Sequence, residues 1–247
     1  MAMAKQAAEP LWGLLDAHTH ILPGMDDGSA SPEESLEMLR QSLQQGVETV
    51  ALTPHFYPHR ETPEKFLHRR ARAAQQLVEA AGQETLPRAL LGAEVAYFEG
   101  VSRAEAIPQL CIGDSRVLLL EMPFCQWTSR MLGEVRALKE RAGVIPLLAH
   151  VERYLGYHNR QALEEMAGEG VLLQCNASFF LRGWDSILAM RMMRRRQISL
   201  LGSDCHNMTR RPPNLALAAE KIRAKCGEET LDYLREMQAS LSEGGHR

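Results

Sequence analysis

The chain is organised around one stretch of sequence, Asp16-Ala17-His18-Thr19-His20-Ile21-Leu22-Pro23-Gly24-Met25-Asp26-Asp27-Gly28-Ser29. The apolar run Leu11–Asp16 leads into it and predicts a buried strand that ends where the histidines begin. Because His18 and His20 are two residues apart, both imidazoles point to the same side of extended backbone. A Pro-Gly pair then turns the chain, and Asp26 and Asp27 place two carboxylates in a tight loop. Two imidazoles and two carboxylates so close together suit a cation such as zinc, manganese or iron.

The composition is typical of a soluble globular protein with a substantial core, at 45 % hydrophobic and 24 % charged residues. A length of 247 residues is ordinary for a single α/β barrel. The net charge of -3 argues against general binding to nucleic acid or membrane surfaces, and no apolar run is long enough to predict a spanning helix. Residues Met1–Pro10 lack the apolar core of a signal peptide, and the five scattered cysteines fit reduced thiols. We therefore expect a cytoplasmic protein without an integral membrane segment.

Short apolar runs alternate with amphipathic helical patterns along the chain. The predicted strands are Leu11–Asp16, Val47–Thr53, Ala89–Val95, Val117–Met122, Val144–Ala149, Val171–Cys175 and Ile198–Gly202. The predicted helices are Ser31–Gln45, Pro63–Ala81, Ser129–Arg141, Arg160–Ala167, Asp185–Arg196, Pro213–Lys225 and Glu228–Leu241. This alternation predicts parallel strands with right-handed crossovers. We expect one domain over residues 1–247, with a core at about 11–241 and a frayed end at Glu243–Arg247.

Candidate metal ligands follow six of these seven apolar runs. They are His18, His20, Asp27, His55, Glu94, Glu121, His150, Asp204 and His206. Any one of them could be an ordinary strand-end acid or a hydrogen-bonded core histidine. In a barrel, however, the carboxyl ends of the strands converge on one face, so their joint placement predicts a metal site and favours a closed or distorted barrel. A catalytic ion typically uses three protein ligands, and nine therefore suit two or three neighbouring ions, an arrangement used on phosphate esters.

Longer motifs resemble a known group of enzymes. The residues Asp16–His20, Glu94, His150 and Asp204–His206 resemble the PHP (polymerase and histidinol phosphatase) superfamily of metal-dependent phosphoesterases. Further motifs are similar to the bacterial PHP-type protein tyrosine phosphatases of capsule and exopolysaccharide synthesis, the CpsB/YwqE type. These motifs are His20–Ser29, Leu52–His55, Leu120–Pro123, His150–Tyr154 and Ser203–Asn207. The resemblance runs from Asp16 to about Arg211, nearly the whole chain.

This resemblance implies a distorted (β/α)7 barrel, PHP-type and TIM-barrel-like, that holds three divalent ions. The ions would be manganese or iron, with zinc as a further candidate. One ion would be held by His18, His20, Glu94 and Asp204, a second by Glu94, Glu121 and His150, and the third by Asp27, His55 and His206. Arg153 would contact the phosphate and stabilise the transition state, helped by Arg211 or Arg210, since a guanidinium fork matches phosphate geometry. No role is assigned to Asp26.

The implied activity is hydrolysis of phosphotyrosine on protein by a metal-activated hydroxide, without a phosphoenzyme. The substrate would be the tail of a bacterial tyrosine kinase that controls polysaccharide export. One alternative is a small-molecule phosphatase of the histidinol-phosphate kind, for which a closed pocket would be expected rather than an open one. A second is a non-catalytic PHP module, which retention of all nine ligands argues against. An oligomer is compatible with the amphipathic helix Ser31–Gln45, although a barrel helix buries the same face.

Cys205 to Arg211 also reads C-x5-R, the spacing of cysteine-based tyrosine phosphatases. Those enzymes need a phosphate loop of backbone amides and a free thiolate. Here Asn207-Met208-Thr209 contains no glycine, and Cys205 stands between two predicted ligands. We therefore favour metal chemistry. Four histidines are expected to be solvated, namely His59, His68, His158 and His246, and several aromatic residues fit either the core or a pocket wall, namely Phe56, Tyr57, Phe124, Trp127, Phe179, Phe180 and Trp184.

Overall fold

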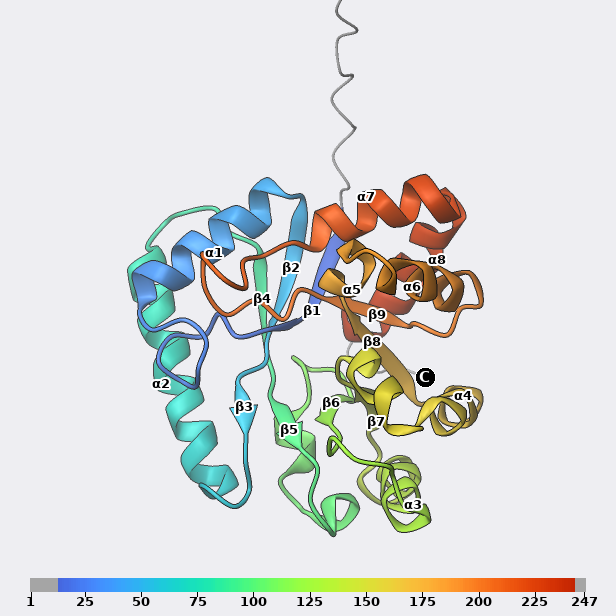
Figure 1. Ribbon diagram of the computed structural model, residues 1–247. Coiled ribbons are helices and arrows are strands. Elements are labelled where there is room, and N and C mark those ends of the chain that lie inside the picture. Colours follow the sequence, from blue (N-terminus) through green and yellow to red (C-terminus); the bar gives the residue numbers. More distant parts are fainter. Residues whose placement is uncertain (1–12, 243–247) are drawn as a thin grey trace, which may run out of the picture.

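Parallel strands curl around a common axis, with helices packed outside them (Figure 1). The computed structural model describes residues 13–242, so the predictions for Met1–Pro10, Glu243–Arg247 and His246 lie outside the described residues. The strands are β1 (Leu14–Thr19), β2 (Val47–Leu52), β3 (His55–Phe56), β4 (Arg88–Leu91), β5 (Glu94–Ala96), β6 (Val117–Glu121), β7 (Ile145–Leu148), β8 (Leu172–Asn176) and β9 (Leu200–Gly202).

Seven of the α-helices between residues 13 and 242 correspond to the predicted amphipathic patterns, whereas the helix at Ala177–Leu181 was not predicted. They are α1 (Pro32–Gln44), α2 (Pro63–Ala81), α3 (Ser129–Ala137), α4 (Arg160–Gly168), α5 (Ala177–Leu181), α6 (Asp185–Arg194), α7 (Leu215–Cys226) and α8 (Glu228–Ser242). Short helices of other types are η1 (Val101–Arg103), η2 (Ile107–Leu110), η3 (Leu138–Ala142) and η4 (Val151–Tyr157). The side chain of Ser31 caps α1 by accepting from the N–H of Glu34, and Thr62 caps α2 in the same way.

The barrel is distorted because two of its strands are interrupted, giving β2 and β3 in one place and β4 and β5 in the other. One sheet has the order β1-β2-β4 and the other β3-β5-β6-β7-β8-β9. The ladder nevertheless continues across the break, because the N–H of Gly92 donates to Leu52 O at 2.9 Å and that of Glu94 donates to Pro54 O at 3.0 Å. Counting β2 with β3 and β4 with β5, the described chain has seven strand positions. The expected distorted (β/α)7 barrel is confirmed.

The first and last strands meet beside the histidines. Asp204 N donates to His18 O at 2.9 Å, and His20 N donates to Cys205 O at the same distance. The prediction that the first strand ends before the histidines was wrong, because β1 continues through His18 to Thr19 along this contact. The prediction of a single strand over Ala89–Val95 was also wrong. An apolar run does not reveal that Gly92 packs against Ile112, where a Cβ would lie 3.1 Å from a side-chain carbon.

Alternation along the strands separates a packed interior from the site at its end. Leu119 lies in a buried cluster inside the barrel, and Glu121, two residues later, is on the same face of β6. On β8 the same alternation carries Leu172, Gln174 and Asn176. The strand ends therefore present polar groups above an apolar floor. None of the helices between residues 13 and 242 has the length and hydropathy needed to cross a bilayer.

At Gly202, strand β9 lies close to side chains of β1 and β8. A Cβ there would lie 2.6 Å from the Cβ of His18 and 2.7 Å from Gln174 Nε2. We expect Gly202→Ala to lower the free energy of unfolding by about 1–3 kcal/mol, as overpacking does. Gly133→Ala is the control, because its Cβ would meet open space on helix α3. Urea denaturation in the presence of a chelator measures both. Equal stability of the two variants would contradict the close approach at Gly202.

Candidate metal centre

All nine predicted ligands meet at the carboxyl ends of the strands. Ligand atoms within 4.8 Å of one another form three groups: His18, His20 and Asp204; His55, Glu94 and Glu121; and His20, Asp27, His55 and His206. His150 joins the second group, since its Nε2 lies 2.9 Å from Glu94 Oε1 and 3.4 Å from Glu121 Oε1. The groups share His20 and His55 and adjoin one another. The nine side chains therefore form one continuous cluster rather than separate sites.

The first group has two imidazole nitrogens that face each other. His18 Nε2 and His20 Nε2 are 3.1 Å apart, and both rings are fully buried. The opposite nitrogens have their own acceptors, because His18 Nδ1 is 3.1 Å from Gln174 Oε1 and His20 Nδ1 is 2.8 Å from Asp26 Oδ2. When Nδ1 carries the proton in each ring, Nε2 carries a lone pair. Two lone pairs at this separation require a shared cation or proton between them.

Glu94 lies at the middle of the cluster. Its Oε1 faces His150, and its Oε2 lies 2.9 Å from His55 Nδ1, 3.2 Å from His18 Nε2 and 3.3 Å from His20 Nε2. Burial alone would raise the pKa of Glu94, but the surrounding histidines lower that pKa well below its usual value. Glu94 is therefore a buried carboxylate, placed to bridge ions in neighbouring groups.

The third group lies nearest to solvent. Asp27 is 68 % exposed, and its Oδ1 is 3.5 Å from His206 Nε2 and 3.7 Å from His55 Nε2. His206 Nδ1 is 3.0 Å from the Asp204 carbonyl, which it can donate to, leaving Nε2 free to bind a metal. Burial and the neighbouring His20 lower the pKa of His206 to about 4. Its imidazole is neutral at pH 7, the form that coordinates metals.

The donors fit divalent metal ions. Four buried ligand atoms have no hydrogen-bond partner among the described residues: His55 Nδ1, Glu94 Oε2, His150 Nδ1 and His206 Nε2. A buried polar atom without a partner is costly, and a cation removes that cost for three of these, which face other ligands. Imidazole and carboxylate donors suit manganese, iron or zinc. The cluster has the composition and the unsatisfied lone pairs of a multi-metal site.

Asp204 connects this cluster to the predicted arginines. Its Oδ1 faces the Nε2 atoms of His18 and His20 at 3.7 and 3.5 Å. Its Oδ2 accepts from Arg153 and from Asn176 Nδ2 at 2.8 Å, and it forms an ion pair with Arg211 at 2.5 Å. One carboxylate thus faces the metal ligands with one oxygen and orients two guanidinium groups with the other.

The three predicted arginines are not equivalent in space. Arg153 and Arg211 reach the centre and remain 37 % and 39 % exposed, so they are accessible to a substrate. Arg210 is exposed, and its backbone N–H donates to Asn207 Oδ1 at 2.8 Å. The geometry favours Arg211 over Arg210 as the partner of Arg153.

Two ligands occupy left-handed backbone conformations. The φ angles of His150 and Asp204 are +33° and +54°. Such conformations are uncommon for residues other than glycine and tend to gather at functional sites. The turn at His150 leads into η4, a helix that the hydrophobic pattern did not predict and that carries Arg153.

Three residues of the centre were not predicted. Asp26 Oδ2 lies 2.8 Å from His20 Nδ1, and the Asp26 carboxylate also accepts hydrogen bonds from the backbone N–H groups of His55 and Gly28 at 2.8 and 2.9 Å. Gln174 Oε1 accepts from His150 N at 2.6 Å besides facing His18, and Asn176 contacts Asp204. The sequence held a signal for the amides, because Val171–Cys175 is the one apolar run with no His, Asp or Glu directly after it, and Gln174 and Asn176 at its end fall on the same face of the strand.

The surroundings of Cys205 do not suit a catalytic nucleophile. Cys205 is fully buried, and burial raises the pKa of its thiol well above the usual value. Arg211, the last residue of the C-x5-R sequence, points to Asp204 instead. A protonated, buried thiol is a poor nucleophile, so the geometry opposes cysteine chemistry. His59, His68 and His158 are exposed, in keeping with their expected solvation.

The contacts of Asp26 generate a test of its role as the group that orients His20. Asp26→Asn removes the negative charge and one of the two carboxylate oxygens, and we expect it to weaken metal affinity about 10- to 100-fold. Asp114→Asn changes an exposed acid elsewhere and serves as the control. Competition titration against a chelator measures the affinity of both variants. Wild-type affinity in Asp26→Asn would show that Asp26 does not orient a ligand.

Several known proteins are similar to this chain in sequence or in fold. Tyrosine-protein phosphatase YwqE of Bacillus subtilis is 29 % identical over 234 residues, which cover 92 % of this chain and 91 % of the relative. A solved structure of the metal-dependent tyrosine phosphatases YwqE from B. subtilis and CpsB from Streptococcus pneumoniae matches with a TM-score of 0.82 and 26 % identity, covering 95 % of this chain and 96 % of that one. Histidinol phosphate phosphatase from Lactococcus lactis, at 14 % identity and a TM-score of 0.51, covers 92 % of this chain and 94 % of its own and shares the fold.

A family model matches residues 14–240, nearly the whole chain, and describes CpsB/CapC proteins of capsular polysaccharide synthesis. The resemblance inferred from the strand-end motifs is therefore confirmed. The chain belongs to the CpsB/CapC family of capsular polysaccharide synthesis.

Proposed function

We propose that the chain is a metal-dependent protein tyrosine phosphatase that hydrolyses phosphotyrosine monoesters. The observation that carries the proposal is Asp204, whose carboxylate faces metal-ligating histidines on one side and two accessible arginines on the other. A phosphate group needs both kinds of contact, cations on its oxygens and guanidinium donors beside them. The curated names of the relatives support the same activity.

Three divalent ions would occupy the three ligand groups, and manganese is the proposed metal, with iron or zinc as alternatives. The division of ligands proposed from the sequence places His18, His20, Glu94 and Asp204 on one ion, Glu94, Glu121 and His150 on a second, and Asp27, His55 and His206 on the third. The groups of neighbouring ligand atoms support this division in part: they join His18, His20 and Asp204, and they join Asp27, His55 and His206. They also add His20 to the third group and place His55 with Glu94 and Glu121. Bound divalent ions would stabilise charge on the phosphoryl oxygens and lower the pKa of water.

The arginines would bind the phosphoryl group and hold it in place. Asp204 fixes one nitrogen of Arg153 and of Arg211, and the other N–H groups of each fork remain available. Preorganised donors of this kind stabilise the charge that develops in a transition state without having to reorient. Asp204 would therefore position both arginines, while Arg153 and Arg211 touch the substrate.

The mouth of the site favours a protein substrate over a small metabolite. Phe124 and Tyr157 are 46 % and 40 % exposed beside the centre. The Phe124 ring is stacked on His150 with centroids 6.0 Å apart and lies 6.4 Å from the Tyr157 ring. Exposed aromatic faces next to a metal ligand offer a surface for the phenyl ring of phosphotyrosine. With Arg153, Arg211 and Asp27 also accessible, the site is open rather than enclosed.

The chemistry of the leaving group also favours phosphotyrosine. The phenol of tyrosine has a pKa of about 10, far below that of an aliphatic alcohol, so phenolate can leave without a strong general acid. We propose that the physiological substrate is the tail of a bacterial tyrosine kinase of capsule or exopolysaccharide synthesis, consistent with the family's role. Such a tail would be met in the cytoplasm.

Metal removal and restoration test the proposed function. The chain is stripped with a chelator, reloaded with manganese, iron or zinc, and compared on a phosphotyrosine peptide, a phosphoserine peptide and histidinol phosphate. We expect metal-dependent hydrolysis of the phosphotyrosine peptide well above that of the other two. Preference for histidinol phosphate would favour the small-molecule alternative, and no metal-dependent activity on any substrate would contradict enzymatic function.

Four variants assign the chemistry in the same assay. Cys205→Ser should retain activity, whereas His55→Ala should lose it along with metal. Arg211→Ala should lower kcat/KM by about 10²–10³-fold, the usual effect of removing one transition-state donor, and Arg210→Ala serves as its adjacent comparison with a smaller effect. Loss of activity in Cys205→Ser with intact metal content would instead support thiol chemistry.

A further inference from the structure

A pocket of about 540 Å³ opens beside the metal centre, between the loop at Asp27 and the start of α2. Asp27 and His55 line the end at the metal centre, and the rest of the lining, called the outer wall here, includes Tyr57, Arg60, Glu61, Lys65 and Arg69. The end at Asp27 and His55 belongs to the centre described above. The outer wall is rich in cations, and neither the metal ligands nor the phosphate-binding arginines account for them.

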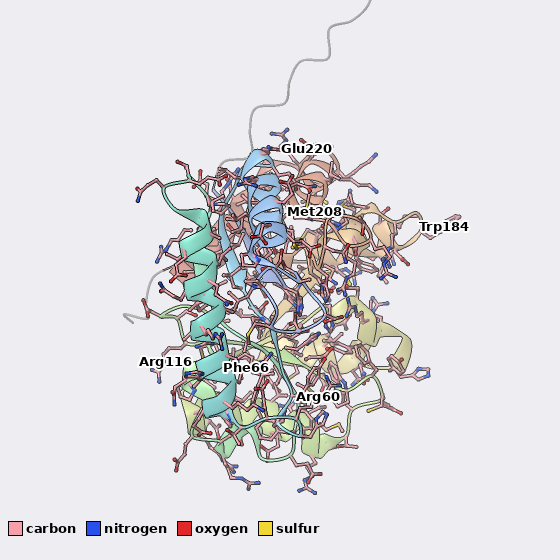
Figure 2. All side chains as sticks on the ribbon, turned by 90° about the vertical axis from the view of Figure 1, so that its left-hand side faces the viewer. Arg60, Phe66, Arg116, Trp184, Met208 and Glu220 are labelled. Atoms are coloured by element: carbon pink, nitrogen blue, oxygen red, sulfur yellow. The ribbon has the colours of Figure 1, made fainter. Side chains whose placement is uncertain are left out.

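Arg60 is held at a fixed place on this wall. The Tyr57 ring is stacked on the His55 ring, with centroids 5.0 Å apart and an interplanar angle of 28°. The Arg60 guanidinium carbon in turn lies 4.4 Å from the centre of the Tyr57 ring. Such cation–π contacts orient a guanidinium while leaving its N–H edge free. Arg60 therefore stands one aromatic ring beyond a metal ligand, on the same side of the molecule as α2 (Figure 2).

The basic side chains of the outer wall differ in whether they form ion pairs. Arg69 forms an ion pair with Glu61 at 2.5 Å and donates to Met25 O at 2.6 Å, so it serves to fasten α2 to the metal-binding loop. Arg60 and Lys65 are exposed and form no ion pair with any residue between 13 and 242. Their charges are available to a ligand, and a concave site strengthens the field that such charges produce.

We propose that Arg60 and Lys65 bind acidic side chains that flank the phosphotyrosine, so that the enzyme selects acidic peptides. This inference rests on the phosphotyrosine phosphatase function proposed above. An extended peptide advances roughly 3.3 Å per residue, so side chains two or three positions from the phosphotyrosine lie roughly 7–10 Å along the chain. That reach fits a wall that begins one stacked ring beyond His55. Carboxylates bound there would hold the peptide in the pocket while the phosphate occupies the metal centre.

The test uses three phosphotyrosine peptides of equal length and the metal-loaded protein. The residues within three positions of the phosphotyrosine are Gln in one peptide, Glu in the second and Lys in the third. We expect kcat/KM for the Glu peptide to exceed that for the Gln peptide roughly three- to twentyfold, through a lower KM, and the Lys peptide to be the poorest substrate. The preference should shrink when the salt concentration is raised, because exposed charges are screened.

Variants then assign this preference to the two residues. Arg60→Gln and Lys65→Gln should each lower the Glu-to-Gln ratio of kcat/KM roughly two- to fivefold, whereas Arg60→Lys, which keeps the charge, should retain most of it. Arg195→Gln and Lys139→Gln change exposed cations on other faces and should leave the ratio unaltered. Thermal denaturation of each variant checks that folding is intact.

The outcomes are distinct. Equal kcat/KM for the three peptides, or a ratio unchanged in both Arg60→Gln and Lys65→Gln, would overturn the inference while leaving the phosphatase function standing. Loss of the Glu-to-Gln preference in Arg60→Lys would also overturn the inference. It would mean that the preference depends on packing of the guanidinium on Tyr57 and not on the positive charge. If none of the peptides is hydrolysed, the proposed function fails and the inference fails with it.

Discussion

The burial of Glu94 among four imidazoles is the interaction on which the rest of the centre depends. A lone buried carboxylate would take up a proton, but protons on the imidazoles of His18, His20 and His150 lower the pKa of Glu94, and metal ions bound in place of those protons would keep it ionised in the same way. Each histidine comes from a strand end, so this arrangement exists only when the barrel is closed and its strands are in register. The backbone bonds between β1 and the end of β9 hold that closure beside His18 and His20. Folding and assembly of the site are thus one event.

A surrounding layer of polar groups orients the side chains of the cluster. Asp26 Oδ2 and Gln174 Oε1 lie within hydrogen-bond distance of Nδ1 of His20 and of His18, and a proton on each Nδ1 would leave Nε2 free to bind a metal. Asp204 extends the order outward by holding Arg153 and Arg211 at the mouth. The left-handed backbone at His150 and Asp204 fits the same pattern, since strain of this kind is sustained where neighbouring contacts over-determine the conformation. The proposed ligands, the groups that orient them and the proposed phosphate-binding arginines therefore form successive layers.

Much of this arrangement could be predicted from the sequence, because strand-end residues of metal-binding type are visible in it. The nine ligands and the seven strand positions follow from apolar runs and the side chains after them. The orienting residues could not be predicted in the same way, since Gln174 and Asn176 are amides, which bind a metal less often than imidazole or carboxylate. The break between β4 and β5 depends on packing at Gly92, and the choice between Arg210 and Arg211 depends on a loop conformation. Neither feature can be predicted from hydrophobic periodicity.

We propose that one barrel face binds several metal ions around Glu94. An anomalous difference map from crystals of the manganese-loaded protein would locate them. We expect separate peaks within the three ligand groups, with Glu94 next to more than one of them. A single peak, or peaks away from these nine side chains, would contradict it.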